Sequence, residues 1–120
     1  MLAHANRDPQ RECCGLLAGS GGLISCIYPA ANVAANPAKN YEIAPTEVFA
    51  LIRTMREEKI EFLGIYHSHP NGSGEPSPTD IDLAYYPDVA YFIAAGRPDI
   101  TVRAFSINER RVAELKIQVE

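Results

Sequence analysis

The feature that most constrains this chain is an apolar run, Phe62–Tyr66, that ends in His67-Ser68-His69-Pro70. An apolar segment of this length, between a helical pattern and a loop, predicts a buried central strand. Alternate strand residues point to the same face of a sheet, so both histidines would project to one side. Two imidazoles on the rigid end of a strand can both bind one metal ion, at about 2.0–2.1 Å. The motif alone leaves open that each histidine is an ordinary surface or core residue.

A third possible ligand follows a Gly/Pro/Ser-rich loop that we expect over residues 71–78. Ser77-Pro78-Thr79-Asp80 has the pattern of a helix start, with serine at the N-cap, proline first and an acid third. We expect this helix to run to about Tyr85. Asp80 would lie close to the histidines once the loop folds back. Two histidines, one aspartate and a water make a four-coordinate zinc site of the catalytic kind, although capping alone would also explain Asp80.

A metal-dependent hydrolase also needs a general base near the water that attacks its substrate. Glu12 stands immediately before the apolar run Cys13–Ala18. A carboxylate in a partly apolar setting has a raised pKa, which suits a base. Most glutamates in such positions are simply solvated, however, and the sequence alone does not bring Glu12 close to His67.

The remaining pattern predicts helices interleaved with mostly antiparallel strands, an α/β (α+β-like) layered domain. The expected strands are Cys13–Ala18 and Leu23–Tyr28, joined by a turn at Gly19–Gly22, a brief Tyr41–Ile43, then Val89–Ala95, Thr101–Ile107 and Val112–Val119. A helix should begin at Pro45, because Val48, Leu51, Ile52 and Met55 form one apolar stripe.

Composition bounds the class of protein. The 120 residues suffice for a single domain, and 47% hydrophobic with 22% charged residues is typical of a globular protein. The net charge of -4 argues against a nucleic-acid partner. No apolar run is long enough to span a membrane. The N-terminal segment lacks a signal-peptide core, and three cysteines make no disulfide framework, so we expect a cytoplasmic protein.

Three motifs together resemble a known family. They are Glu12-Cys13-Cys14-Gly15-Leu16-Leu17, then His67-Ser68-His69-Pro70, then Pro76-Ser77 followed by Asp80 at the spacing Ser-x-x-Asp. In this order they resemble the JAMM (MPN+, Mov34/MPN/PAD-1) zinc metalloproteases. The resemblance covers nearly the whole chain, so we expect residues 1–120 to form one such domain. The family fold, a curved mixed sheet flanked by helices, is similar to that of cytidine deaminases.

The resemblance implies a role for each matching residue. His67, His69 and Asp80 match the family's zinc ligands, with one Zn²⁺ per chain. Glu12 matches the general base that activates water and then protonates the leaving amine. Ser77 matches the side chain that helps to hold the oxyanion. Family members usually begin with a full amphipathic helix, so we expect Met1–Asn6 to be the last turn of a truncated one.

The family implies cleavage after the C-terminal glycines of a ubiquitin-like protein. The chain is similar to compact prokaryotic members, including the Mec type, which act on ubiquitin-like sulfur carriers. Two alternatives stay open: a catalytically silent scaffold that only binds partner proteins, and a zinc peptidase for another peptide, related to cell walls or phages. The leaving group, the metal used in the cell and the oligomeric state are not determined by the sequence.

Overall fold

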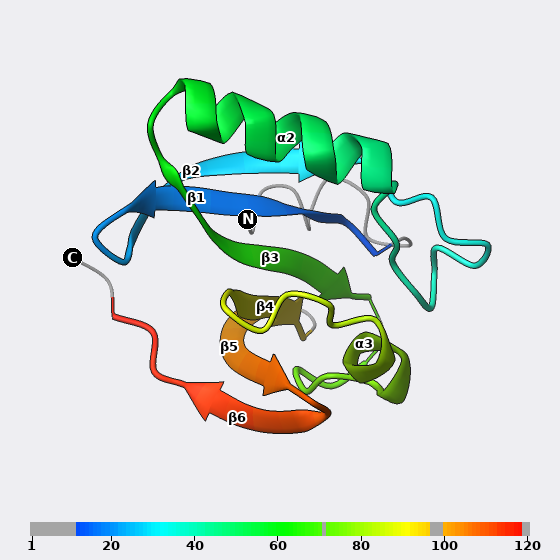
Figure 1. Ribbon diagram of the computed structural model, residues 1–120. Coiled ribbons are helices and arrows are strands. Elements are labelled where there is room, and N and C mark those ends of the chain that lie inside the picture. Colours follow the sequence, from blue (N-terminus) through cyan, green and yellow to red (C-terminus); the bar gives the residue numbers. More distant parts are fainter. Residues whose placement is uncertain (1–11, 71, 97–99, 119–120) are drawn as a thin grey trace.

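The computed structural model describes residues 12–70, 72–96 and 100–118, which form a six-stranded mixed sheet and two helices (Figure 1). In chain order the elements are β1 (Cys14–Ser20), β2 (Leu23–Ala30), α2 (Pro45–Glu57), β3 (Glu61–His69), α3 (Pro78–Asp82), β4 (Ala90–Ala95), β5 (Thr101–Asn108) and β6 (Arg111–Leu115). The predicted layered α+β domain is confirmed. Within these described ranges, neither helix is long and apolar enough to cross a bilayer.

The strand order across the sheet is β2-β1-β3-β4-β5-β6. β3 and β4 are parallel, whereas the other neighbouring strands of the described sheet are antiparallel. The chain therefore crosses from the end of β3 back to the start of β4, and α3 lies on this crossover (Figure 1). Open sheets with such crossovers bind ligands at the carboxyl ends of their strands. In this protein that end of β3 carries the two histidines.

α2 lies across β1 and β2 on one face of the sheet (Figure 1). Pro45 begins the helix, and the apolar stripe predicted from the sequence is confirmed, because Val48 and Met55 are buried against Leu16 and Ala18 of β1. This packing removes the apolar side of the helix from water, which supplies most of the stability of an amphipathic helix. The helix thereby fixes β1, whose first residue follows directly on the Glu12-Cys13 pair.

The sheet buries an apolar cluster on each face. Cys14, Tyr41, Ile65, Val89, Tyr91, Ile93, Ala95, Phe105 and Ile107 form the cluster on one face. Cys13, Leu17, Tyr66, Phe92, Ala94 and Ala104 form the cluster on the other. Strand alternation places Ile65 and Tyr66 in different clusters, and it continues into the histidines. His67 and His69 therefore share the face of Ile65, beside Ile93 and Ala95 of the first cluster, which are their register partners on β4.

The turn predicted at Gly19–Gly22 is shorter than expected, because β1 continues to Ser20. Three further predictions of elements or their ends are wrong. Tyr41–Ile43 is not a strand, because this segment bonds locally, through the donation from Val33 N–H to Glu42 O at 2.8 Å. The helix expected to reach Tyr85 ends at Asp82, since Tyr86 precedes a proline and packs back onto the first cluster. The last strand stops at Leu115, because β6 is exposed throughout and gains no burial by continuing. The predicted N-terminal helical turn lies outside the described residues.

The C-terminus of α2 has a Schellman-type ending without glycine. Lys59 N–H donates to Arg56 O at 3.1 Å, and Ile60 N–H donates to Met55 O at 3.0 Å. This geometry requires a left-handed residue after the cap, and Lys59 has a φ of 59°. The left-handed region is strained for a lysine but not for a glycine.

We expect Lys59→Gly to raise the free energy of unfolding by about 0.5–1 kcal/mol. The strain energy that the glycine removes from the folded state should exceed the stability lost through the greater entropy of the unfolded chain. Urea denaturation of the metal-free protein measures the change. Glu58→Gly is the matched control: Glu58 has a right-handed backbone, so the same replacement one position earlier should destabilise the protein. A destabilised Lys59→Gly would contradict the strain argument.

Candidate metal centre

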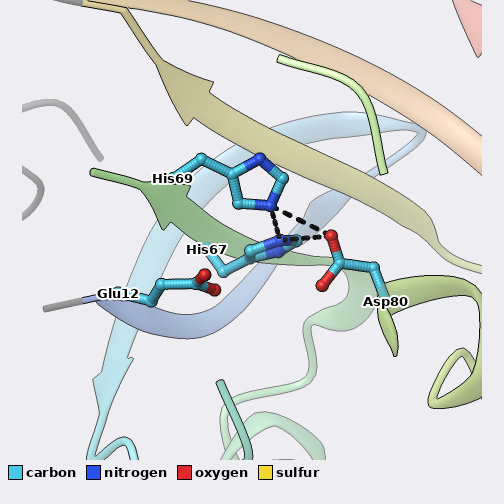
Figure 2. Close-up of side chains that lie close together, drawn as sticks. All are labelled: Glu12, His67, His69 and Asp80. Carbon is cyan, nitrogen blue, oxygen red and sulfur yellow. Dashed lines mark hydrogen bonds and ion pairs between the residues drawn. The ribbon is translucent and has the colours of Figure 1, made fainter. Parts of the chain in front are cut away.

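His67 and His69 meet at the carboxyl end of β3, as their alternation predicts. Their Nε2 atoms are 2.9 Å apart, and both side chains are buried. Asp80 Oδ2 lies 3.1 Å from His67 Nε2 and 3.0 Å from His69 Nε2. Figure 2 shows the three side chains converging from β3 and α3 on one small space. The loop does fold back and bring Asp80 to the histidines.

Asp80 is held by the helix start that the sequence predicts. Ser77 is the N-cap of α3, and its Oγ accepts the Asp80 N–H at 3.1 Å. In return Asp80 Oδ2 accepts the Ser77 N–H at 2.9 Å, which completes a capping box. The capping and ligand interpretations are therefore compatible, because one carboxylate oxygen caps the helix and faces both histidines.

Glu12 reaches the same space from β1. β1 pairs with β3 in an antiparallel register that places Cys14 opposite His67. Cys13 N–H donates to Ser68 Oγ at 2.8 Å and Ser68 N–H donates to Cys13 O at 3.0 Å, which extends the pairing toward Glu12. Ligand atoms of Glu12, the two histidines and Asp80 all lie within 4.8 Å of one another (Figure 2). The structure thus brings Glu12 to three residues that are distant from it in the sequence.

The donor atoms fit a metal ion. His69 Nδ1 donates to Ser73 O at 2.7 Å in the neutral imidazole, which leaves the Nε2 lone pair facing Asp80. An imidazole lone pair and a carboxylate oxygen have no proton to share, so their approach needs a cation or a proton between them. Glu12 Oε1 and His67 Nδ1 are buried without a hydrogen-bond partner in the described structure. Buried polar atoms of this kind indicate a place where a bound group would supply the missing interactions.

The electrostatic setting favours the charged carboxylate of Asp80 and the neutral imidazole of His67, which are the forms that bind a metal ion. Burial alone would raise the pKa of Asp80, but the hydrogen bonds with His67 and His69 outweigh it and hold that pKa well below its usual range. Burial lowers the pKa of His67, so its imidazole is neutral near pH 7. Burial also opposes the charged form of His69, yet its hydrogen bonds to Asp80 and Ser73 raise its pKa overall. An arriving cation would displace a proton there.

Glu12 differs from Asp80 in its electrostatic setting. Burial raises the pKa of Glu12 from 4.5 to about 7, with His69 lowering it and Asp80 raising it by smaller amounts. Two carboxylates in one buried site thus have separated pKa values, a pattern that divides the roles of ligand and proton carrier. Glu12 is suited to take up and release a proton near neutral pH.

Sequence reasoning missed two residues that hold the site. Tyr41 stacks on His67 with ring centroids 4.2 Å apart and an interplanar angle of 18°. Asn32 Nδ2 donates to Glu12 O at 2.8 Å and to Asn40 O at 2.9 Å. Asn32 belongs to an Ala/Asn-rich stretch that reads only as a loop, and a lone tyrosine before a helix gives no signal of stacking. Both contacts depend on tertiary structure.

A cleft of about 480 Å³ opens beside the four residues. It is lined by Glu12, Ala38, Lys39, His69, Pro70, Gly72, Ser73, Glu75, Pro76, Ser77 and Pro78. The predicted oxyanion residue Ser77 is thus on the wall of the cleft that Glu12 and His69 also face. The arrangement can hold a metal ion, a proton carrier and a hydroxyl donor around one bound group.

Comparisons with known proteins agree with this chemistry. A family model described as prokaryotic homologs of the JAB domain matches residues 1–108. The chain is 33% identical to the desampylase of Haloferax volcanii, over 100% of this chain and 89% of that protein. It is 32% identical to the CysO-cysteine peptidase of Mycobacterium tuberculosis, over 99% of this chain and 84% of that protein. A solution structure of a protein from Desulfitobacterium hafniense has a TM-score of 0.87 at 31% identity, covering 100% of this chain and 86% of that one.

We expect one divalent ion, tested as Zn²⁺, to bind per chain and to raise the melting temperature. At a thousandfold excess over its Kd the ion would stabilise the fold by about 4 kcal/mol. Asp80→Asn should lose most of this shift, because it removes the carboxylate that faces both histidines. Asp82→Asn changes an exposed carboxylate of the same helix and should keep the shift. Equal zinc-induced shifts in the two variants would contradict the site.

Proposed function

The chain belongs to the family of prokaryotic homologs of the JAB domain, and we propose that it is a zinc-dependent peptidase of a ubiquitin-like or sulfur-carrier protein. It hydrolyses the bond that follows the C-terminal glycines of that carrier. The observation that carries the proposal is the buried meeting of Glu12 with His67, His69 and Asp80, all within 4.8 Å. A protein that served only as a silent scaffold would gain nothing from burying four ionisable groups together.

Zinc would be held by His67, His69 and Asp80. When bound, it acts as a Lewis acid that makes water more acidic and polarises a carbonyl oxygen. Two nitrogens and one oxygen donor leave room for a further ligand, which a catalytic site needs. Cysteine is absent from this donor set, whereas structural zinc sites are usually rich in cysteine.

Glu12 carries the proton. As a carboxylate it takes a proton from the attacking water, and as a carboxylic acid it passes that proton to the leaving nitrogen. The burial that raises its pKa to about 7 makes both forms accessible near neutral pH. Its backbone is fixed on both sides, because Glu12 N–H donates to Pro37 O at 2.7 Å and Glu12 O accepts from Asn32.

Ser77 stabilises the negative charge that develops on the carbonyl oxygen. Its Oγ already accepts the Asp80 N–H, so the hydroxyl proton is left to donate into the cleft. Helix capping fixes this oxygen in place before the substrate arrives. A donor held in this way needs no reorganisation during the reaction, which is the basis of oxyanion stabilisation.

The substrate class rests on relatives of similar length. Two proteins that align with almost the whole chain are named desampylase and CysO-cysteine peptidase. The desampylase name refers to removal of a modifier, and the second to a carrier joined to cysteine. A glycine-ended tail suits the cleft beside Ser77, because an extended backbone can bind through its own N–H and C=O groups.

We expect Glu12→Gln to abolish cleavage while the protein still binds zinc, because the amide cannot accept a proton. The assay follows carrier proteins extended by one residue beyond Gly-Gly, with the metal content of each sample measured in parallel. Glu57→Gln, on the exposed side of α2, is the control and should cleave normally. Cleavage at the wild-type rate by Glu12→Gln would sink the assignment of the base.

We expect Ser77→Ala to lower kcat by about 10²–10³-fold, as loss of an oxyanion donor does. The variant should also lose about 0.5–2 kcal/mol of stability, because it removes the α3 cap. Ser77→Thr keeps both the hydroxyl and the cap, so it separates the two effects and should retain most activity. If Ser77→Ala lost stability but kept kcat, Ser77 would be a cap and nothing more.

A further inference from the structure

The catalytic cleft has two unlike walls. One wall is the segment Gly72–Pro78, which carries Ser77, and the other is formed by Ala38 and Lys39 beside Glu12. Lys39 is exposed and is the one lysine or arginine among the described residues that line this cleft. It forms no ion pair with another described residue. The cleft therefore has an unmatched positive charge on the wall of Glu12.

The backbone of Lys39 is fixed relative to Glu12. Lys39 N–H donates to Asn36 O at 3.1 Å, and Asn40 N–H donates to the same oxygen at 2.9 Å. The side-chain amide of Asn32 ties Asn40 O and Glu12 O together. The loop that carries Lys39 is thus joined to the backbone of the proton carrier through a few short bonds, so the lysine side chain starts from a fixed point beside Glu12.

Charge elsewhere in the cleft does not cancel Lys39. Glu75, on the opposite wall, lies 4.0 Å from the guanidinium of Arg103, which also pairs with Glu114 at 2.7 Å. Glu12 lies at the reacting centre, with its ligand atom within 4.8 Å of those of His67, His69 and Asp80. A substrate carboxylate farther along the wall would therefore meet the cation of Lys39, because Glu12 and Glu75 are the acids of the described lining.

The direction of the reaction assigns this wall to the leaving group. Hydrolysis adds water oxygen to the glycine carbonyl carbon and breaks the C–N bond, and Glu12 passes the proton from that water to the departing nitrogen. The nitrogen must therefore lie next to the Glu12 carboxyl. The atoms beyond the nitrogen then extend along the neighbouring Ala38–Lys39 wall, whereas the glycine carbonyl oxygen faces Ser77.

We propose that Lys39 pairs with the α-carboxylate of a single amino acid leaving the carrier, so that the enzyme prefers carrier–amino acid adducts to isopeptide conjugates. In such an adduct the carboxylate is two bonds from the departing nitrogen. In an isopeptide the nitrogen is joined to the methylene chain of a lysine, which has no charge near it. The inference rests on the proposed function and narrows its substrate class.

Three substrates test the proposal, all made from one carrier protein that the wild-type enzyme cleaves. The carrier ends in Gly-Gly followed by alanine with a free carboxylate, by alaninamide, or by the ε-nitrogen of a lysine peptide. Wild-type kcat/KM should be about tenfold or more higher for the free acid than for the amide, as expected for a hydrogen bond between charged groups. Lys39→Gln should raise KM for the acid by that factor and leave the amide unchanged, since both substrates share the chemistry.

Two further variants make the test specific. Lys39→Arg keeps the charge and should restore most of the preference for the acid. Lys116→Gln removes an exposed lysine that does not line the cleft and should behave as wild type. Equal kcat/KM for acid and amide, or faster cleavage of the isopeptide, would overturn the role of Lys39 while supporting the peptidase. No cleavage of any carrier substrate would contradict the proposed function instead.

Discussion

The antiparallel pairing of β1 with β3 is the constraint on which the site depends. It places Cys14 opposite His67, and the exchange of hydrogen bonds between Cys13 and Ser68 continues the pairing beyond the start of β1. Glu12 is the next residue along, so its side chain is brought to the ligands by backbone register. A slip of one residue would turn Glu12 to the other face of the sheet. Glu12 and the two histidines are therefore positioned by the same ladder that holds the centre of the fold.

The same arrangement explains why the four residues suit a bound cation. Burial of two carboxylates and two imidazoles opposes folding unless their charges and lone pairs are matched. Asp80 finds partial compensation in the helix cap and the histidines, whereas Glu12 Oε1 has no hydrogen-bond partner within the described ranges. The raised pKa of Glu12 follows from this poor solvation. The carboxyl group with the poorer solvation is thus also the one whose pKa suits it to exchange a proton near neutral pH.

How much the sequence could predict depended on the range of the interaction. Alternation along one strand placed His67 and His69 on one face, and a capping pattern placed Asp80 in the first turn of α3; both are local and both are confirmed. The place of Glu12 depends on register between strands 55 positions apart, so only a family resemblance could connect it to the histidines before the structure did. Tyr41 was misread as strand because its stacking on His67 leaves no periodic trace in the sequence.

Catalysis and specificity are carried by different kinds of element in this fold. The proposed metal ligands and proton carrier lie on or beside paired strands and on a capped helix, where small changes of sequence would disturb the packing of the sheet. Lys39 lies on a loop fixed by Asn32, where a side chain can change without altering the strands. Relatives named for different substrates have nearly the same identity to this chain, 33% and 32%, so overall similarity does not choose between them. Under the proposed mechanism, discrimination between leaving groups rests on a few positions, and a departing nitrogen beside Glu12 would place them on the neighbouring wall of the cleft.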